Sequence, residues 1–175
     1  MLEMAHPLVD QLRFTRGEWL RALDGVPEQD GATRLQPMNS ISWIVFHLAW
    51  HEQLNFLTRL DGRTPVPQAN EHGVSGQPAS TPPMADALRA WRAVTLGSDR
   101  VLDSLDSARL AAWMPNAPTP RLIGSTIQRI TYHYWFHIGE ITAIRQILGH
   151  AQVPEFVGDI DALAPYRAEA SEEPA

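Results

Sequence analysis

Four long segments carry apolar residues at the three- and four-residue spacing of amphipathic helices, and this pattern constrains the fold more than any other feature. The predicted helices cover Pro7–Leu23, Asn39 or Ser40 to Leu60, Pro83–Leu105 and Ser125–Leu148. Asp24-Gly25, Asp61-Gly62 and Gly149 provide helix stops. No segment shows strand-like alternation. We therefore predict an all-α, antiparallel four-helix bundle.

Two long connections and a C-terminal extension accompany these helices. Residues Arg63–Pro83 are rich in Pro and Gly, and a loop of this length is a candidate rim for a pocket. The second connection contains Pro115, Pro118 and Pro120, and both connections are long enough to cross over the bundle. We expect residues 1–160 to form the bundle and residues 161–175 a flexible acidic tail. Phe156, Val157 and Ile160 are expected to cross the bundle, and Glu169, Glu172 and Glu173 to lie in the tail.

Charge and hydropathy exclude several classes of partner. The 175-residue chain is the size of one domain, and its formal net charge is −6. No stretch clusters Arg with aromatic residues, so we expect no nucleic-acid partner. No apolar run approaches the ~20 residues of a membrane span, and the N-terminus lacks a signal-peptide pattern. The expected location is the cytoplasm.

The composition also limits the chemistry. All 14 basic side chains other than histidine are Arg, and the chain has neither Lys nor Cys. These absences exclude a Walker-A lysine, Schiff-base chemistry, cysteine zinc sites and a thiol nucleophile from the protein itself. With 7 His and 6 Trp available, we expect any demanding chemistry to use histidine.

The histidines fall at positions that suit a metal site. His133 and His137 are four residues apart, so they lie on one face of the predicted fourth helix, together with apolar residues that face the bundle interior. His47 lies on the buried face of the second helix. Two histidines at this spacing can hold one divalent metal, and an imidazole from a facing helix can complete a three-nitrogen site. The alternative is a set of core histidines with satisfied hydrogen bonds.

The two histidine helices resemble the signature helices of the DinB (YfiT-like) superfamily. The matching stretches are His47-Leu48-Ala49-Trp50-His51-Glu52 and His133-Tyr134-Trp135-Phe136-His137-Ile138-Gly139-Glu140. The resemblance implies a four-helix bundle in which His47, His133 and His137 bind one divalent metal ion, with zinc, nickel and iron all compatible. It also implies a metal-dependent enzyme, because some members use low-molecular-weight thiols such as mycothiol, bacillithiol or glutathione.

Two further residues lie beside this predicted triad. Glu140 stands where Gln is common in the family, and it is a candidate to orient a ligand, add a fourth ligand or accept a proton. It is also a candidate for a surface acid that pairs with Arg145 or Arg129. His51 is an extra ligand, a group that orients a ligand or, as we prefer, a partly buried polar neighbour.

The remaining features lean towards structural roles. Trp43, Trp50, Trp91 and Trp135 are expected in the core or in dimer contacts, which makes a homodimer our expectation. The hydroxyl groups of Tyr132 and Tyr134 are expected at the rim of a pocket. Arg129 and Arg145 either bind an anionic substrate or belong to a solvated helix face.

These features lead to one main hypothesis about function. We expect an enzyme in which the metal activates a low-molecular-weight thiol or water to attack a small electrophile, as an S-transferase or a hydrolase. Since the chain lacks Cys, a reactive thiol has to arrive with a cofactor. The alternative is a non-catalytic, metal-binding protein that acts in stress-associated binding or interaction, for which a closed, four-ligand site would be the sign.

Overall fold

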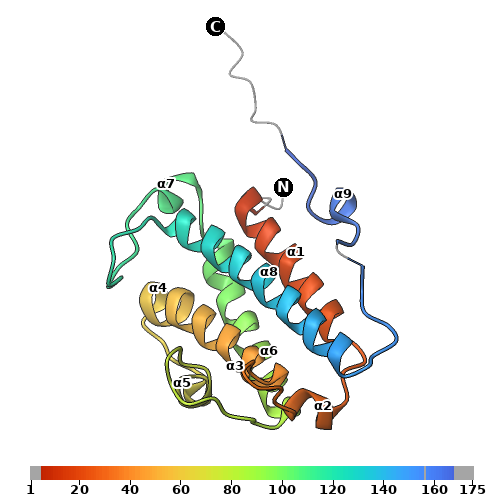
Figure 1. Cartoon of the computed structure of the whole chain (residues 1–175). Helices are drawn as coiled ribbons and strands as arrows, with labels where there is room; N and C mark the ends of the chain where they lie inside the picture. The colour runs from red at the N-terminus through yellow and green to blue at the C-terminus, as the bar shows by residue number, and fades with distance from the viewer. Residues whose placement is uncertain (1–4, 156, 168–175) are drawn as a thin grey trace, which may run out of the picture.

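The computed structural model describes residues 5–155 and 157–167 and is helical (Figure 1). Phe156, Glu169, Glu172 and Glu173, which the sequence analysis assigned to the C-terminal extension, lie outside the described residues. Within the described part there is no strand, and the β-type pairing there is one isolated bridge between Trp113 and Leu122. The all-α prediction is therefore confirmed.

The long helices correspond to the four predicted segments. They are α1 (Pro7–Leu23), α3 (Ile41–Glu52), α6 (Met84–Asp103) and α8 (Ile123–Ile147). The chain continues from α3 through a π-helical segment, η1 (Gln53–Thr58), into α4 (Arg59–Asp61). In Figure 1, α1 lies beside α8, and α3 contacts both α6 and α8. The pairing of α3 with α8 brings the two histidine motifs together.

Short helices occupy the connections, which the sequence analysis treated as loops. They are α2 (Glu28–Ala32), α5 (Pro67–His72), α7 (Ser107–Leu110) and α9 (Ile160–Leu163). Of these, α5 lies in the predicted Arg63–Pro83 loop and packs against α3. The long loop is therefore an ordered structure beside a histidine helix.

Local signals set most helix ends as predicted. The side chain of Ser40 accepts a hydrogen bond from the amide of Trp43 at 3.2 Å, so Ser40 is the N-cap of α3. Gly62, with a φ of 69°, ends α4. The predicted start of the fourth helix at Ser125 was wrong, because α8 begins at Ile123. The amide of Ile123 donates to the carbonyl of Ala112 and anchors the helix start two residues earlier.

An apolar core lies where the long helical segments meet. Its fully buried side chains include Trp19 from α1, Phe56 from η1, Leu102 from α6 and Ile127 from α8. Burying an apolar side chain of this size contributes about 1.5–3 kcal/mol. These contacts hold α3 and α8 in a fixed register.

The described end of the chain returns to α1. The side-chain amide of Gln11 donates to the carbonyl of Ala164 at 2.8 Å, and Arg167 pairs with Asp10. Residues up to 167 therefore contact the bundle, while the boundary at residue 160 stays a prediction.

Candidate metal centre

Four histidines meet where α3 and α8 run antiparallel. His47 and His51 are one turn apart on α3, and His133 and His137 are one turn apart on α8. The ring centroids lie 5.3 Å apart for His47 and His137, and 4.7 Å apart for His51 and His133. The register of the two helices therefore pairs each histidine with one from the facing helix.

Three Nε2 atoms from this group converge. The Nε2 of His133 lies 3.1 Å from that of His47 and 3.0 Å from that of His137. One ligand atom from each of the three residues falls within 4.8 Å of the others, so the trio can hold a metal ion. Tetrahedral coordination with zinc–nitrogen bonds of about 2.0–2.1 Å separates neighbouring nitrogens by about 3.3 Å. The donor set and its spacing fit such an ion.

The opposite ring nitrogen of each of these histidines has its own partner. The Nδ1 of His47 lies 2.7 Å from the carbonyl oxygen of Gly73, and that of His137 lies 2.8 Å from Oε2 of Glu140. A carbonyl and a carboxylate only accept, so both Nδ1 atoms carry the proton and leave the Nε2 lone pairs for a metal. The Nδ1 of His133 lies 3.2 Å from that of His51. Partners of this kind orient metal-binding imidazoles.

Burial favours the neutral form of His47 and His133. It is the largest cause that lowers the pKa of His47 to about 4 and that of His133 to about 2. The neighbouring imidazoles lower both values further. His47 and His137 are 6% exposed, while His133 is partly exposed. Metal binding requires the unprotonated ring, so this environment prepares His47 and His133 for metal binding at neutral pH.

Gly73 is a site residue that the sequence analysis did not name. It follows α5, and its carbonyl reaches His47 from the predicted Arg63–Pro83 loop. A Cβ at this position would collide with the backbone of Phe46 and would lie 2.9 Å from the amide nitrogen of His47. Only glycine allows this close approach without a shift of the loop. The length of the loop was the signal for a rim, but not for this residue.

Aromatic rings surround the histidines. Trp43 stacks on His47, with ring centroids 4.8 Å apart and an interplanar angle of 8°. Trp50 lies 5.6 Å from His47, and Phe136 lies 5.2 Å from His137 and is 70% exposed. The predicted core role therefore fits the buried Trp43, whereas Phe136 stands at the surface next to the site.

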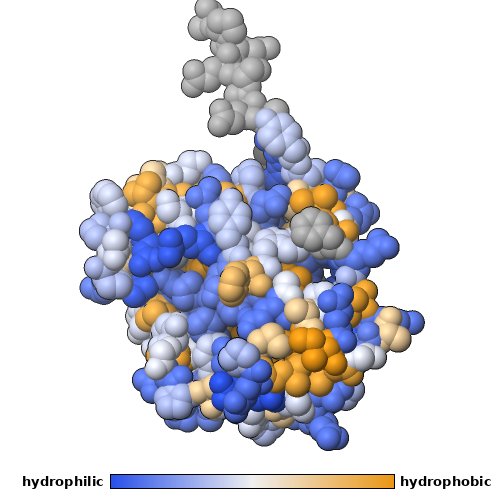
Figure 2. All heavy atoms as spheres, in the orientation of Figure 1, coloured by the Kyte–Doolittle hydropathy of each residue, from blue (hydrophilic) through white to orange (hydrophobic). Residues whose placement is uncertain are grey.

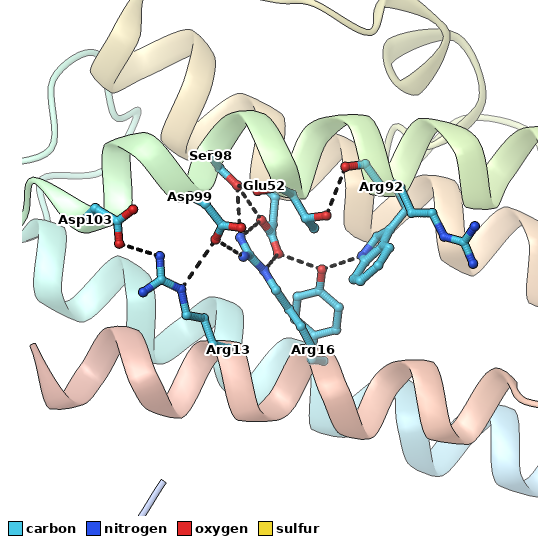
Figure 3. Close-up of polar contacts among 10 residues, drawn as sticks. Arg13, Arg16, Glu52, Arg92, Ser98, Asp99 and Asp103 are labelled. Atoms are coloured by element: carbon cyan, nitrogen blue, oxygen red, sulfur yellow. Dashed lines mark hydrogen bonds and ion pairs between the residues drawn. The ribbon is translucent and has the colours of Figure 1, made fainter. Parts of the chain in front are cut away.

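A buried polar network lies directly behind the histidines (Figure 3). Glu52 of α3 is fully buried, and Arg16 of α1 binds it in a two-pronged ion pair, with Nε–Oε1 and Nη2–Oε2 distances of 2.9 and 2.5 Å. Ser98 and Asp99 of α6 also bind the Arg16 guanidinium, at 2.9 and 2.7 Å. Burial alone would lower the pKa of Arg16, but Glu52 raises it above its ordinary value. Glu52 is part of the predicted family motif, but no role was expected for it.

Tyr134 joins the fourth long helix to this network. Its hydroxyl donates to Oε1 of Glu52 at 2.6 Å and accepts from the indole nitrogen of Trp91 at 2.6 Å. The residue is fully buried, and burial together with Glu52 raises the pKa of the phenol well above its ordinary value. The prediction of a rim hydroxyl was therefore wrong for Tyr134, whereas Tyr132 is 68% exposed.

The structure also separates the two arginines that the sequence analysis treated together. Arg145 is buried and donates to the carbonyls of Ala22 and Gln152 and to Nδ1 of His150, which lies outside the histidine cluster. Arg129 precedes His133 by one turn on α8 and is exposed. Glu140 binds His137 and neither arginine. Of this pair, only Arg129 is placed to meet a ligand near the histidines.

Fold and site together define a helical bundle with a trihistidine cluster between two facing helices. The sequence model of the DinB superfamily matches residues 11–141. The chain belongs to this superfamily. Among curated proteins, none matches the chain. No helix in the described residues combines the length and hydropathy that a membrane crossing needs.

Proposed function

We propose that the protein is a metal-dependent enzyme in which a low-molecular-weight thiol or a water molecule attacks a small electrophile. The observation that carries this proposal is the convergence of three Nε2 atoms at 3.0 and 3.1 Å, each ring having another partner on its Nδ1 atom. Membership in the DinB superfamily supports it.

The three imidazoles of His47, His133 and His137 would hold the ion. When bound, a divalent ion supplies the acidity that turns a thiol or a water into a nucleophile near neutral pH. Three histidines leave coordination positions open, which is typical of catalytic rather than structural zinc sites. His133 is partly exposed, so a substrate can approach from its side of the cluster.

Glu140 acts through His137 in this proposal. Its carboxylate accepts the Nδ1 proton of His137 at 2.8 Å, on the side of the ring that faces away from the Nε2 cluster. This contact holds the ring in the orientation and tautomer that ligation needs. Glu140 is therefore a positioning residue, and its expected role as a proton acceptor for the substrate has less support.

His51 has an equivalent part for His133. Its Nδ1 lies against the Nδ1 of His133, so it contacts the outer side of a ligand ring. It is a neighbour that orients His133 and not an extra ligand. Trp43 and Trp50 limit the access of water around His47.

The test is a screen for metal-dependent turnover. The zinc-, nickel- or iron-loaded protein is incubated with glutathione, bacillithiol or mycothiol and a chromogenic aryl halide, or with an activated ester alone. We expect one combination to react in the loaded protein and to lose its reaction in His137→Gln. The matched control is His6→Asn, which removes a histidine outside the cluster and keeps an N-cap side chain on α1.

The same screen addresses the competing function. If the fully metal-loaded protein turns over no thiol–electrophile pair and no ester, the proposal fails and a non-catalytic metal-binding role replaces it. If turnover persists in metal-free protein or in His137→Gln, the trihistidine cluster is not the site of reaction.

A further inference from the structure

The two histidine faces continue beyond the metal centre in the same antiparallel register. On the α3 side, Asn55 follows His51 by one turn, and Arg59 follows Asn55. On α8, Arg129 precedes His133 by one turn. Because His51 already faces His133, the next turn of the two helices brings Arg129 towards Asn55 and Arg59. The row of facing side chains that begins at the trihistidine cluster therefore ends among arginines.

Arg121 adds a third guanidinium at this end of the row. It stands two residues before the start of α8, on the connection that leads into the helix. We call Arg59, Arg121 and Arg129 the arginine cluster. In Figure 2 the surface over the N-terminal half of α8 and the adjoining α4 is strongly hydrophilic.

The positive charges of the arginine cluster act on His51. Burial is the largest cause of the lowered pKa of His51, about 4, followed by His47 and then by the positive charges of all three arginines. Arg121 also lowers the pKa of Arg59, after burial. Arg59 and Arg121 are near enough to repel each other, and such repulsion has a cost unless an anion joins them.

No carboxylate offsets these charges in the described part of the chain. Arg59 donates to the side chain of Asn55 at 2.6 Å, and Arg121 donates to the carbonyl of Thr119 at 3.4 Å. Other arginines such as Arg13, Arg21 and Arg89 pair with acidic residues. With 20 acidic and 14 basic residues, acids are in excess. These three guanidinium groups beside the candidate metal centre are therefore available to an anion from outside the chain.

We infer that the arginine cluster is an oxyanion-binding subsite, and that the substrate is a small molecule with a carboxylate or phosphate group at one end and its reactive centre at the trihistidine cluster. The assignment of the reactive end rests on the proposed function, whereas anion binding itself does not. Guanidinium groups bind both oxyanions through paired, charge-assisted hydrogen bonds.

Two neighbouring side chains prepare this subsite. Asn55 is buried, donates to the carbonyl of His51 at 2.8 Å and accepts from Arg59, so it fixes the guanidinium relative to the helix. His51 meets His133 through Nδ1, and its Nε2 has no hydrogen-bond partner among the described residues. When His133 donates to His51, the Nε2 of His51 carries a proton and becomes a further donor to the anion.

Calorimetry on the full chain tests the inference, with inorganic phosphate and succinate as the probes. The metal is first removed with a chelator, so that neither probe binds through an ion. We expect at least one probe to bind, and Arg129→Gln and Arg121→Gln to weaken it by about tenfold or more. Arg92→Gln is the matched control, because this exposed arginine of α6 does not belong to the arginine cluster. Its side chain points away from the buried network in Figure 3.

The outcomes separate the sources of the anion and the two proposals. A response to succinate alone indicates a carboxylate substrate, and a response to phosphate alone a phosphorylated one. If neither probe binds, or if Arg129→Gln and Arg121→Gln bind like Arg92→Gln, the inference is overturned. Anion binding without any thiol or ester turnover overturns only the proposed function, and turnover with unchanged anion binding overturns only this inference.

Discussion

Two polar clusters lie side by side between α3 and α8, and they differ in chemistry. One is the histidine cluster of the candidate metal centre, and the other is the buried network around Glu52. His51 and His133 belong to the histidine cluster, whereas the next residues in the chain, Glu52 and Tyr134, belong to the buried network. A helix turns by about 100° per residue, so one step along the sequence moves a side chain from the face of the histidine cluster to the face of the buried network. Adjacent residues in each motif thus serve different purposes.

The difference lies in how each cluster satisfies its polar atoms. In the buried network, the Glu52 carboxylate accepts from Arg16, Ser98 and Tyr134, and so unites all four long helices. In the histidine cluster, three Nε2 atoms face one another with lone pairs that an external partner has to satisfy. The closed cluster contributes to the stability of the fold, and the open one supports ligand binding.

The largest expected effect is the loss of the metal from His137→Gln. Removing one of three ligands leaves two imidazoles, so we expect metal content, measured by elemental analysis after dialysis, to fall from about one ion per chain to near zero. The metal-free variant should keep its urea unfolding midpoint close to that of the parent. A variant that retains a full equivalent of metal would disprove the ligand assignment.

Glu52→Ala is expected to lower the stability of the fold and to leave metal binding intact. This substitution leaves the Arg16 guanidinium buried without its main partner, and breaking a buried ion pair costs about 3–5 kcal/mol. Urea unfolding of the metal-free protein measures the loss, and the folded fraction should still bind one metal ion. A loss below about 1 kcal/mol would mean that Asp99 compensates for Glu52.

A smaller effect is expected from Glu140→Gln. The amide is a weaker acceptor for the Nδ1 proton of His137, and the loss of such an outer partner lowers metal affinity by about 10–100-fold. Competition with a chromogenic chelator measures the affinity. Unchanged affinity, with a changed pH profile of turnover instead, would favour the role of a proton acceptor.

The smallest expected effect is on the acid stability of the metal-free protein. The pKa of His51 is about 4 in the folded chain against an ordinary 6.5, so the unfolded chain binds more protons between these values. Stability should therefore be full above pH 6.5 and fall as the pH drops towards 4, by at most about 1.4 kcal/mol per pH unit for each such histidine. His51→Gln should flatten this slope in urea titrations, and an unchanged slope would show that His51 does not contribute.

Much of the fold followed from local patterns. The first helix has the predicted bounds, and Ser40 caps the second one. The start of α8 was missed because the pairing of Ile123 with Ala112, and not a cap residue, sets it. The short helices within the connections carry too few residues for a periodic signal, and α5 exists where it can pack on α3.

The sequence by itself determined the helices and the spacing of the two histidines on α8, because helical periodicity is a property of neighbouring residues. It also supplied the family motif that singled out His47. The tertiary structure decided which distant groups meet them. The carbonyl of Gly73 is 26 residues from His47, Arg16 is 36 residues from Glu52, and Tyr134 is 82 residues from Glu52. Such contacts depend on the packing register of whole helices, which no local pattern encodes.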